Sequence, residues 1–287
     1  METYGRNTVA AVYTLPEFLA RASGPVSCAD NDSAMRSWLQ ERDPEWMGLK
    51  GEMKDGESSF DCTARLVRDG YPAGIKMIEA VSKKVTAPTP MSVRRVPRWA
   101  DNGDDVDMQR IWNGDLDTAW RTTHRASRRG PQRVRILIDS MANGGLAAKT
   151  LCWRGVAALK LADLLTEAGY SVQVESVIQS KDSFSDVRYK LRTIVKDYEQ
   201  PLDMMTLAAT TTLPAFFRSL VHTWGLAAAN YRRPGVSYSV EPAKIDSFDD
   251  ADTNAATFLI GQDVENATVA SETVTRIVNE LDKAAGE

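Results

Sequence analysis

The chain has 287 residues, 43% of them hydrophobic and 26% charged, with a formal net charge of −4 at pH 7. This composition excludes a collagen-like repeat, a coiled coil and a globally disordered chain, and the length allows one large domain or two modest ones. No run comes near the roughly 20 apolar residues that a membrane helix needs, and the first residues lack the apolar region of a signal peptide. We therefore expect a cytoplasmic protein with no membrane partner.

The region 1–130 is irregular and contains five of the seven tryptophans. Turn-forming residues interrupt it at short intervals, and the segments between them have the pattern of short helices. The expected helices span 15–24, 58–70, 75–84 and 106–112, and a strand over 91–98 would follow the proline-rich break at 87–90. The sequence thus predicts a mainly helical, tryptophan-rich N-terminal region.

The region 131–287 has a clearer pattern of apolar strands and amphipathic helices. Short apolar or alternating runs predict strands at 133–139, 171–179, 187–196, 235–240 and 257–261. Helices are expected at 146–168, 203–209, 214–228 and 265–284. Residues 187–196 alternate between apolar and mostly charged side chains, which is typical of a half-exposed antiparallel edge strand. The order predicts a Rossmann-like, three-layer α/β domain with a mostly parallel sheet and an antiparallel edge strand.

The β-α-β order of 133–179, followed at once by a hairpin to the strand at 187–196, resembles the von Willebrand factor A-type domain. In that family the first strand ends in an Asp-x-Ser-x-Ser loop, which binds a divalent ion with a Thr from a second loop and an Asp from a third. Here the first strand ends in Asp139-Ser-Met-Ala-Asn143, and Thr257-Phe-Leu-Ile-Gly-Gln-Asp263 would form the third loop. Thr206 or one of residues 210–212 could supply the second.

This resemblance implies a Mg²⁺ site made by Asp139, Asn143 and Asp263, but the sequence departs from the motif. Met141 and Asn143 stand at the two hydroxyl positions, and a thioether is a poor ligand for a hard cation. The alternative is that Asp139 accepts hydrogen bonds from main-chain amides at the end of its strand. We expect this second role, and no cofactor.

The chain as a whole is similar to uncharacterised proteins encoded by tailed bacteriophages, which would place it in the host cytoplasm. The stretches that carry this resemblance are Trp46-Met-Gly, Asp69-Gly-Tyr-Pro-Ala-Gly, Val106-Asp-Met-Gln-Arg-Ile-Trp-Asn-Gly, Arg154-Gly-Val-Ala-Ala-Leu-Lys-Leu-Ala-Asp-Leu-Leu, Pro201-Leu-Asp and Leu213-Pro-Ala-Phe-Phe-Arg218. The resemblance brings no established chemistry with it.

Two segments of the chain have opposite charge. Residues 121–135 contain six arginines, one histidine and no acid, whereas residues 241–272 contain eight acids and one lysine. Opposed charges on a nearly neutral chain favour docking to a protein partner or self-association. The candidate partner-binding residues are Arg121, Arg125, Arg128 and Arg129. Together with Trp112 and Trp120, they could alternatively bind nucleic-acid phosphates and stack bases.

The sequence contains no recognisable catalytic motif. Neither a Gly-x-Ser-x-Gly nucleophile turn nor a glycine-rich nucleotide-binding loop occurs. Cys28, Cys62 and Cys152 are scattered without a CxxC pair, which favours buried, reduced thiols over a disulfide framework or a zinc site. We therefore expect a non-enzymatic protein-interaction or assembly factor, with nucleic-acid binding through residues 121–135 as the alternative.

Overall fold

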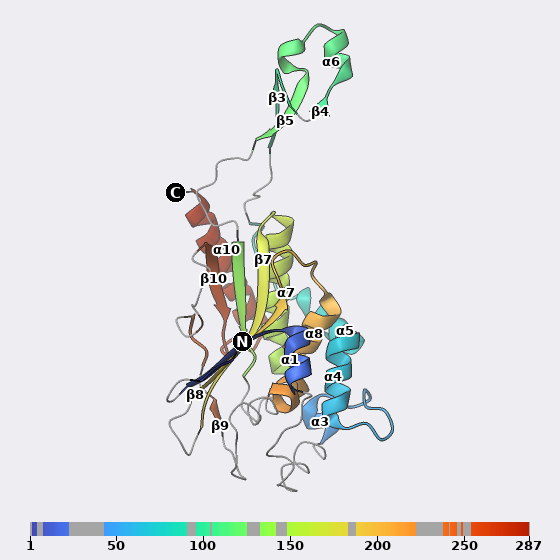
Figure 1. Ribbon diagram of the computed structural model, residues 1–287, viewed down its shortest axis with the longest axis vertical. Coiled ribbons are helices and arrows are strands. Elements are labelled where there is room, and N and C mark those ends of the chain that lie inside the picture. Colours follow the sequence, from blue (N-terminus) through green and yellow to red (C-terminus); the bar gives the residue numbers. More distant parts are fainter. Residues whose placement is uncertain are drawn as a thin grey trace.

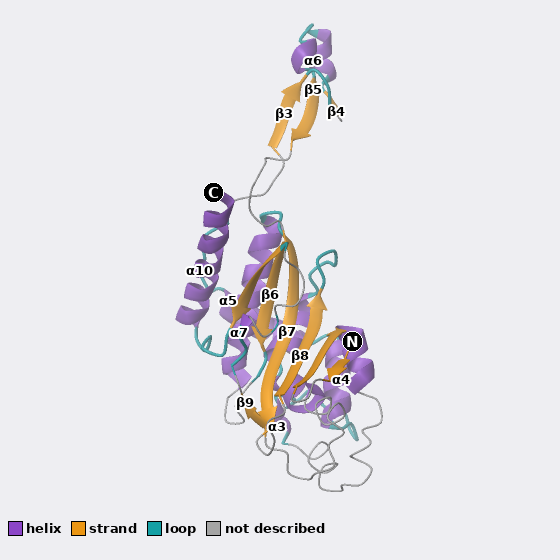
Figure 2. Ribbon diagram, turned by 60° about the vertical axis from the view of Figure 1, so that its left-hand side comes forward, coloured by secondary structure: helices purple, strands orange, loops and turns teal. Residues whose placement is uncertain are grey.

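The computed structural model describes residues 2–4, 8–22, 43–90, 96–103, 105–124, 133–141, 148–182, 188–221, 238–240, 242–245, 248 and 254–286. These residues form a large mixed sheet covered by helices and a small three-stranded sheet (Figure 1, Figure 2). None of the helices within these ranges is long and apolar enough to cross a membrane.

The large sheet has the strand order β1-β2-β8-β7-β6-β10, and β9 pairs with the end of β7. Its strands are β1 (Glu2–Tyr4), β2 (Thr8–Thr14), β6 (Arg133–Asp139), β7 (Ser171–Asp182), β8 (Arg188–Lys196), β9 (Tyr238–Val240) and β10 (Ala255–Ile260). β7, β6 and β10 run parallel to one another, whereas β8 runs antiparallel to β7 and parallel to β2. β1 pairs antiparallel with β2 at the edge. The predicted three-layer α/β class, with a mostly parallel sheet and an antiparallel edge strand, is confirmed.

The strand predicted at 187–196 is present as β8, but its predicted position at the edge of the sheet is wrong. β2 pairs with β8 in parallel, so that β8 lies inside the sheet between β2 and β7. The alternation in its sequence reflects two different faces. Tyr189 and Leu191 pack among apolar side chains, whereas Arg192 forms an ion pair with Glu175 of β7.

The N-terminal region contributes both strands and helices. The predicted helices appear as α1 (Leu15–Ala22), α4 (Ser59–Asp69), α5 (Pro72–Ser82) and α6 (Met108–Trp112), and a further short helix is α3 (Pro44–Met47). β2 was not predicted, and it carries this region into the large sheet. Both regions, 1–130 and 131–287, contribute strands to the large sheet. The division of the chain into two domains at residue 130 stays a prediction.

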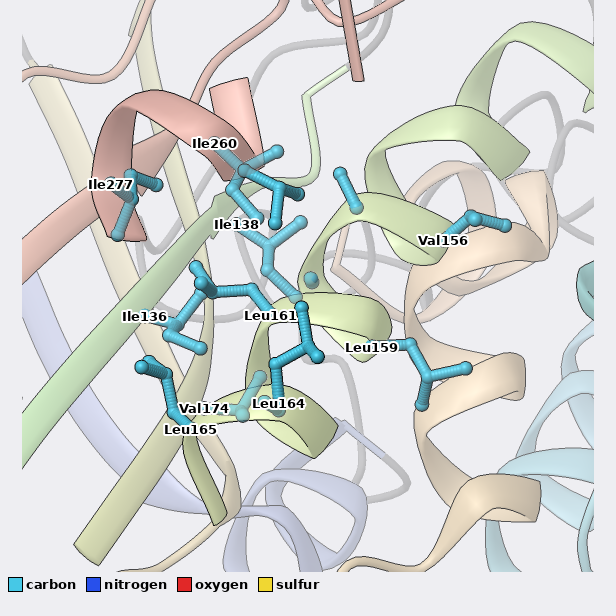
Figure 3. Packing of buried hydrophobic residues seen from close by; sticks show 14 of the residues in the cluster. Ile136, Ile138, Val156, Leu159, Leu161, Leu164, Leu165, Val174, Ile260 and Ile277 are labelled. Carbon is cyan, nitrogen blue, oxygen red and sulfur yellow. The ribbon is translucent and has the colours of Figure 1, made fainter. Parts of the chain in front are cut away.

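The larger hydrophobic cluster lies between the sheet and α7 (Ala148–Glu167), as Figure 3 shows. Ile136 and Ile138 of β6 and Ile260 of β10 meet Leu161 of α7 and Ile277 of α10 (Ala267–Gly286). α5 and α8 (Met204–Thr212) also pack against α7, so that residues 151–159 of this helix are all buried. Burial of each large aliphatic side chain contributes about 1.5–3 kcal/mol, which holds α7 on the sheet.

A second hydrophobic cluster covers the part of the same face formed by β2 and β8. It includes Phe18 of α1, Cys62 and Leu66 of α4, and Phe216 of the π-helical segment η2 (Phe216–Val221). The rings of Phe18 and Phe216 lie 5.7 Å apart between centroids. Residues 222–228 of the helix predicted at 214–228 lie outside the described residues.

The opposite face of the large sheet carries buried charges and a small apolar cluster. Ala243 and Phe248 pack against Leu137 of β6 and Val177 of β7, and thus form a third layer of irregular chain. Beside them Glu175 is fully buried, with its carboxylate 2.7 and 2.9 Å from two guanidinium nitrogens of Arg192. The large sheet therefore has an apolar face under the helices and a partly ionic face under the chain around residues 242–248.

The small sheet has the order β3-β5-β4 and is built from one continuous stretch of chain. Its elements are β3 (Val96–Ala100), β4 (Asp105–Val106), α6, the single 3₁₀ turn η1 (Leu116–Thr118) and β5 (Trp120–His124). We refer to residues 96–124 as the β3–β5 unit. Both views show it standing apart from the large sheet (Figure 1, Figure 2).

Candidate functional site

The end of β6 is closed by the carboxylate of Asp139, which is fully buried. One oxygen accepts a hydrogen bond from the amide of Met141 at 3.0 Å, and the other accepts one from the amide of Ala243 at 2.8 Å. Burial raises the pKa of the Asp139 carboxyl, while the two amide hydrogen bonds oppose that rise. Asp139 therefore fastens the turn after β6 to the chain that covers the other face of the sheet.

Arg154 of α7 joins the ends of two neighbouring parallel strands. It is 2% exposed, and its guanidinium donates to the main-chain oxygens of Asp139 at 3.1 Å, Met141 at 2.6 Å and Gln262 at 3.0 Å. Burial lowers the pKa of Arg154, and the nearby carboxylate of Asp139 opposes this. We name these contacts the Arg154 clamp, since they connect α7 with the carboxyl ends of β6 and β10.

The residues implied by the von Willebrand A-type resemblance have different environments. Both oxygens of Asp139 already accept main-chain hydrogen bonds, Asp263 is exposed, and Asn143 lies outside the described residues. Thr206 donates to the carboxylate of Asp203, and the hydroxyls of residues 210–212 donate to main-chain oxygens of α8. In the described part of the chain, no group of three or more His, Cys, Asp or Glu side chains could hold a metal ion.

A small cavity lies beside the Arg154 clamp, but it has little room for a ligand. Its volume is about 10 Å³, which corresponds to about one water molecule. Its polar lining includes Ser140, whose hydroxyl lies 2.7 Å from that of Ser176. The Arg154 clamp and this cavity therefore lie within a tightly packed part of the core.

The β3–β5 unit is held together by a short set of polar and stacking contacts. Asp107 caps α6 by accepting hydrogen bonds from the amides of Gln109 and Arg110. The guanidinium carbon of Arg110 lies 4.1 Å from the centroid of the Trp99 ring, and that of Arg121 lies 5.7 Å away from it. These cation–π contacts fix both arginines against one indole.

Four large hydrophobic side chains of this unit are exposed to solvent. Trp112 is 78% exposed, Leu116 58%, Met108 49% and Trp99 41%. Among the described residues only one other large hydrophobic side chain, Met205, is exposed. An open groove of about 580 Å³ is lined by Trp99, Asp105, Val106, Asp107, Met108, Gln109, Trp112 and Arg121. We name this surface the aromatic groove.

The structure describes only some of the arginines of residues 121–135, and Arg121 and Arg135 have different environments. Arg121 lies in the aromatic groove, whereas Arg125, Arg128 and Arg129 lie outside the described residues. Arg135, which the alternative included, is 2% exposed and donates a hydrogen bond to the main-chain oxygen of Phe248 at 2.8 Å. The expectation that the exposed basic segment extends to Arg135 is therefore wrong, because the side chain of Arg135 is buried against the large sheet.

The two described cysteines are buried, as predicted, and carry free thiols. Burial raises the pKa of Cys62 and of Cys152 to about 11 in each case. Cys28 lies outside the described residues. A thiol that is buried and protonated at neutral pH is a poor nucleophile. Cys62 and Cys152 pack within the two hydrophobic clusters.

Two features were missed in the sequence. Arg154 lies inside an apolar helical run, and a charged residue in such a run indicates a buried, paired side chain. The aromatic groove was missed because Trp99 and Met108 are residue types that usually pack inside proteins. The signal available for the groove was the density of aspartates around them, which is unusual for a core segment.

Comparison with known proteins gives a family without an assigned activity. No curated protein and no solved structure matches the chain. One family model, described as a domain of unknown function (DUF7192), matches residues 8–285 and so includes the β3–β5 unit and all strands of the large sheet but β1. The chain belongs to the DUF7192 family.

Proposed function

We propose that this protein is a non-enzymatic interaction or assembly factor that docks a protein partner through the aromatic groove. The observation that carries the proposal is the exposure of Trp99, Met108, Trp112 and Leu116 within one small unit. A tryptophan side chain buries about 150–250 Å² when it is covered, and tryptophans are enriched among the residues that dominate binding energy in protein interfaces. Exposed apolar side chains gathered in one place mark interaction sites.

The charge of the surface favours a protein over a nucleic acid. Residues 99–120 contain six aspartates and one arginine, so phosphate groups would be repelled from the groove. Arg121 is the one candidate arginine that lines the groove among the described residues, and it lies over Trp99. The alternative, nucleic-acid binding through Arg125, Arg128 and Arg129, remains a separate prediction with its own test.

The large sheet supports a scaffolding role in this proposal. The order β6-α7-β7-β8, with β10 beside β6, is the order expected for a von Willebrand A-like domain, and we infer that this part of the chain is related to such domains. We also propose that the protein is encoded by a phage. Two observations support a degenerate form of that domain. β2 lies beyond β8, and the carboxylate of Asp139 holds main-chain amides.

The test is retention of a protein on the immobilised chain after nuclease treatment of a lysate from its source cells. We expect one protein to be retained by the wild type and lost with Met108→Ala combined with Trp112→Ala. Met205→Ala is the matched control, because Met205 is also exposed but lies on α8. Equal retention by all three proteins would contradict the proposal. Nuclease-sensitive retention that depends on Arg125, Arg128 and Arg129 would support the alternative instead.

A further inference from the structure

We propose that the aromatic groove binds an arginine side chain carried by a basic segment of the partner protein. The inference rests on the proposed function, since it names the chemistry of the partner at the surface where docking is proposed. It is argued from an exposed indole, from the carboxylates beside it, and from an arginine of the same unit that already binds such a pair of groups.

The groove offers an open aromatic surface. Trp112 is 78% exposed and lines the groove together with Met108, which is 49% exposed. The other indole of the groove, Trp99, already has the guanidinium of Arg110 at 4.1 Å and that of Arg121 at 5.7 Å from its ring centroid. Trp112 is therefore the ring that a cation from outside can cover, and indole attracts cations more strongly than the other aromatic side chains do.

Carboxylates dominate the charge at the groove. Asp105 and Asp107 line it, against one guanidinium, that of Arg121. Arg121 lies opposite Asp105 in the register of β4 and β5, so its charge is set against an acid within the unit. Three further aspartates of the same unit are exposed, namely Asp101, Asp115 and Asp117. The field of this surface therefore attracts a cationic side chain and opposes an anionic one.

The β3–β5 unit itself shows how an arginine fits such groups. The guanidinium of Arg110 lies over the ring of Trp99, and its Nε lies 3.7 Å from the carboxylate of Asp107. One planar cation thus lies against an indole and near a carboxylate at the same time. Trp112 and Asp105 repeat this combination of groups in the groove, and both are exposed. An arginine supplied by the partner fills the groove in the same way.

An arginine fits this combination better than a lysine does. The guanidinium is flat and weakly hydrated, so it stacks on an indole while its N–H groups donate to a carboxylate. A lysine ammonium is a compact and strongly hydrated charge, which loses more hydration when it lies against the ring. The volume of the groove, about 580 Å³, is within the range of sites that hold drug-sized ligands, so it accommodates an arginine together with neighbouring residues of the segment.

The experiment follows the tryptophan indole N–H signals of the full chain by NMR while short peptides are added at low salt. The peptides have the sequence Gly-Ser-Xaa-Ser-Gly, capped at both ends, with arginine, lysine, citrulline or glutamate as Xaa. The signals are assigned with Trp99→Phe and Trp112→Phe. We expect the arginine peptide to shift the signals of Trp99 and Trp112 and to leave that of the buried Trp153 unchanged.

The other peptides separate charge from shape. Citrulline has the shape of arginine without its charge, so its peptide should bind about fivefold more weakly or worse. The lysine peptide should also bind more weakly than the arginine peptide. The glutamate peptide should not bind, because its charge has the sign of the groove.

Two variants test whether the arginine lies in the groove. Asp105→Asn removes a charge but retains an oxygen that can accept the hydrogen bond from the amide of Val106, which measures 3.0 Å. Trp112→Ala removes the open indole. Each change should weaken binding of the arginine peptide by about three- to fivefold. Asp55→Asn is the matched control, because Asp55 is exposed but lies between α3 and α4, so its loss should leave binding unchanged.

Four results would overturn the inference. The first is an arginine peptide that shifts neither indole signal. The second is equal binding of the arginine peptide and the lysine or citrulline peptide, and the third is tighter binding of the glutamate peptide. The fourth is unchanged binding of the arginine peptide by Asp105→Asn and Trp112→Ala, with circular dichroism showing that both variants are folded.

The outcome is distinguishable from failure of the proposed function. In the retention experiment, an excess of the arginine peptide should release the retained protein, and the citrulline peptide should not. If a protein is retained through Met108 and Trp112 but the arginine peptide neither binds nor releases it, the inference is wrong and docking stands. If no protein is retained although the arginine peptide binds at Trp112, docking is wrong and the arginine site stands. If neither is observed, both proposals are wrong.

Discussion

The guanidinium of Arg110 stacks on the indole of Trp99 at 4.1 Å and also donates a hydrogen bond to the main-chain oxygen of Thr118 at 3.3 Å. One side chain thereby connects α6, β3 and η1 within the β3–β5 unit. Among the residues of this unit whose burial the structure describes, only Ala119 is buried, so we expect the order of the unit to depend on such contacts.

Trp99→Ala should loosen the β3–β5 unit without affecting the large sheet. The change removes both cation–π partners and exposes the neighbouring strand, so amide hydrogen exchange in β3 and β5 should accelerate by roughly fivefold or more. Amides of β6 and β7 should exchange as in the wild type. Trp112→Ala is the matched control, since Trp112 is mostly exposed and its loss should leave exchange in the unit almost unchanged.

Arg154→Met should lower the free energy of unfolding by about 3 kcal/mol, because three carbonyl groups, two of them in buried contacts, lose a charged donor. Arg154→Lys should cost less, since the ammonium retains the charge but cannot reach all three oxygens. Urea denaturation gives both values. Arg276→Met serves as the control, because Arg276 pairs with Glu280 on an exposed helix face and should matter by about 0.5 kcal/mol or less. Equal losses for Arg154→Met and Arg276→Met would rule out the clamp.

The buried carboxylate of Glu175 should show strong coupling to Arg192. Glu175→Leu leaves the guanidinium of Arg192 inside the protein without this carboxylate, and we expect a loss of about 3–5 kcal/mol. Adding Arg192→Leu should recover part of that loss, because the remaining pair of apolar side chains no longer buries that charge. Denaturant unfolding of the two single variants and the double variant forms the cycle. Strictly additive losses would mean that the two residues do not interact.

Glu57 should stabilise the fold in a pH-dependent way. Hydrogen bonds from Arg65, at 2.7 and 2.8 Å, lower the pKa of Glu57 from 4.5 to about 2. Because the folded pKa lies below the unfolded value, the contribution is complete above pH 4.5 and is lost as the pH falls toward 2. The difference in stability between the wild type and Glu57→Gln should therefore shrink over this interval, as measured by denaturant midpoints.

The matched control for this prediction is Glu45→Gln. Glu45 pairs with Lys50, but both side chains are largely exposed. Glu45→Gln should therefore have little effect on stability at pH 7 or at pH 2.5. A difference between the wild type and Glu57→Gln that stays constant from pH 7 to pH 2.5 would contradict the assignment.

The elements of the large sheet could mostly be predicted from local patterns. β6, α7 and α10 have apolar periodicities that are strong over short windows, and the sequence placed them within a few residues of their observed bounds. β2 could not be placed in the same way, since its pairing with β8 joins segments about 180 residues apart and no local pattern records it. β8 was predicted at the edge of the sheet because β2, which pairs with it there, had not been predicted.

The candidate site was only partly predictable for a different reason. The arginine cluster was visible as charge, but charge alone does not tell an exposed arginine from a buried one such as Arg135, which lies 3.9 Å from the carboxylate of Glu175 and donates to a carbonyl oxygen. The exposure of Trp112 was equally hidden, because it depends on how few residues surround a small unit. Both properties arise from tertiary packing.

The most direct measurement of the central claim is photo-crosslinking from position 112. A benzophenone side chain replaces Trp112 in one full-length protein and Met205 in a second, and both are irradiated in the source cells. We predict a discrete protein adduct from position 112 and none from position 205. Absence of an adduct at position 112, or the same adducts from both positions, would contradict docking through the aromatic groove.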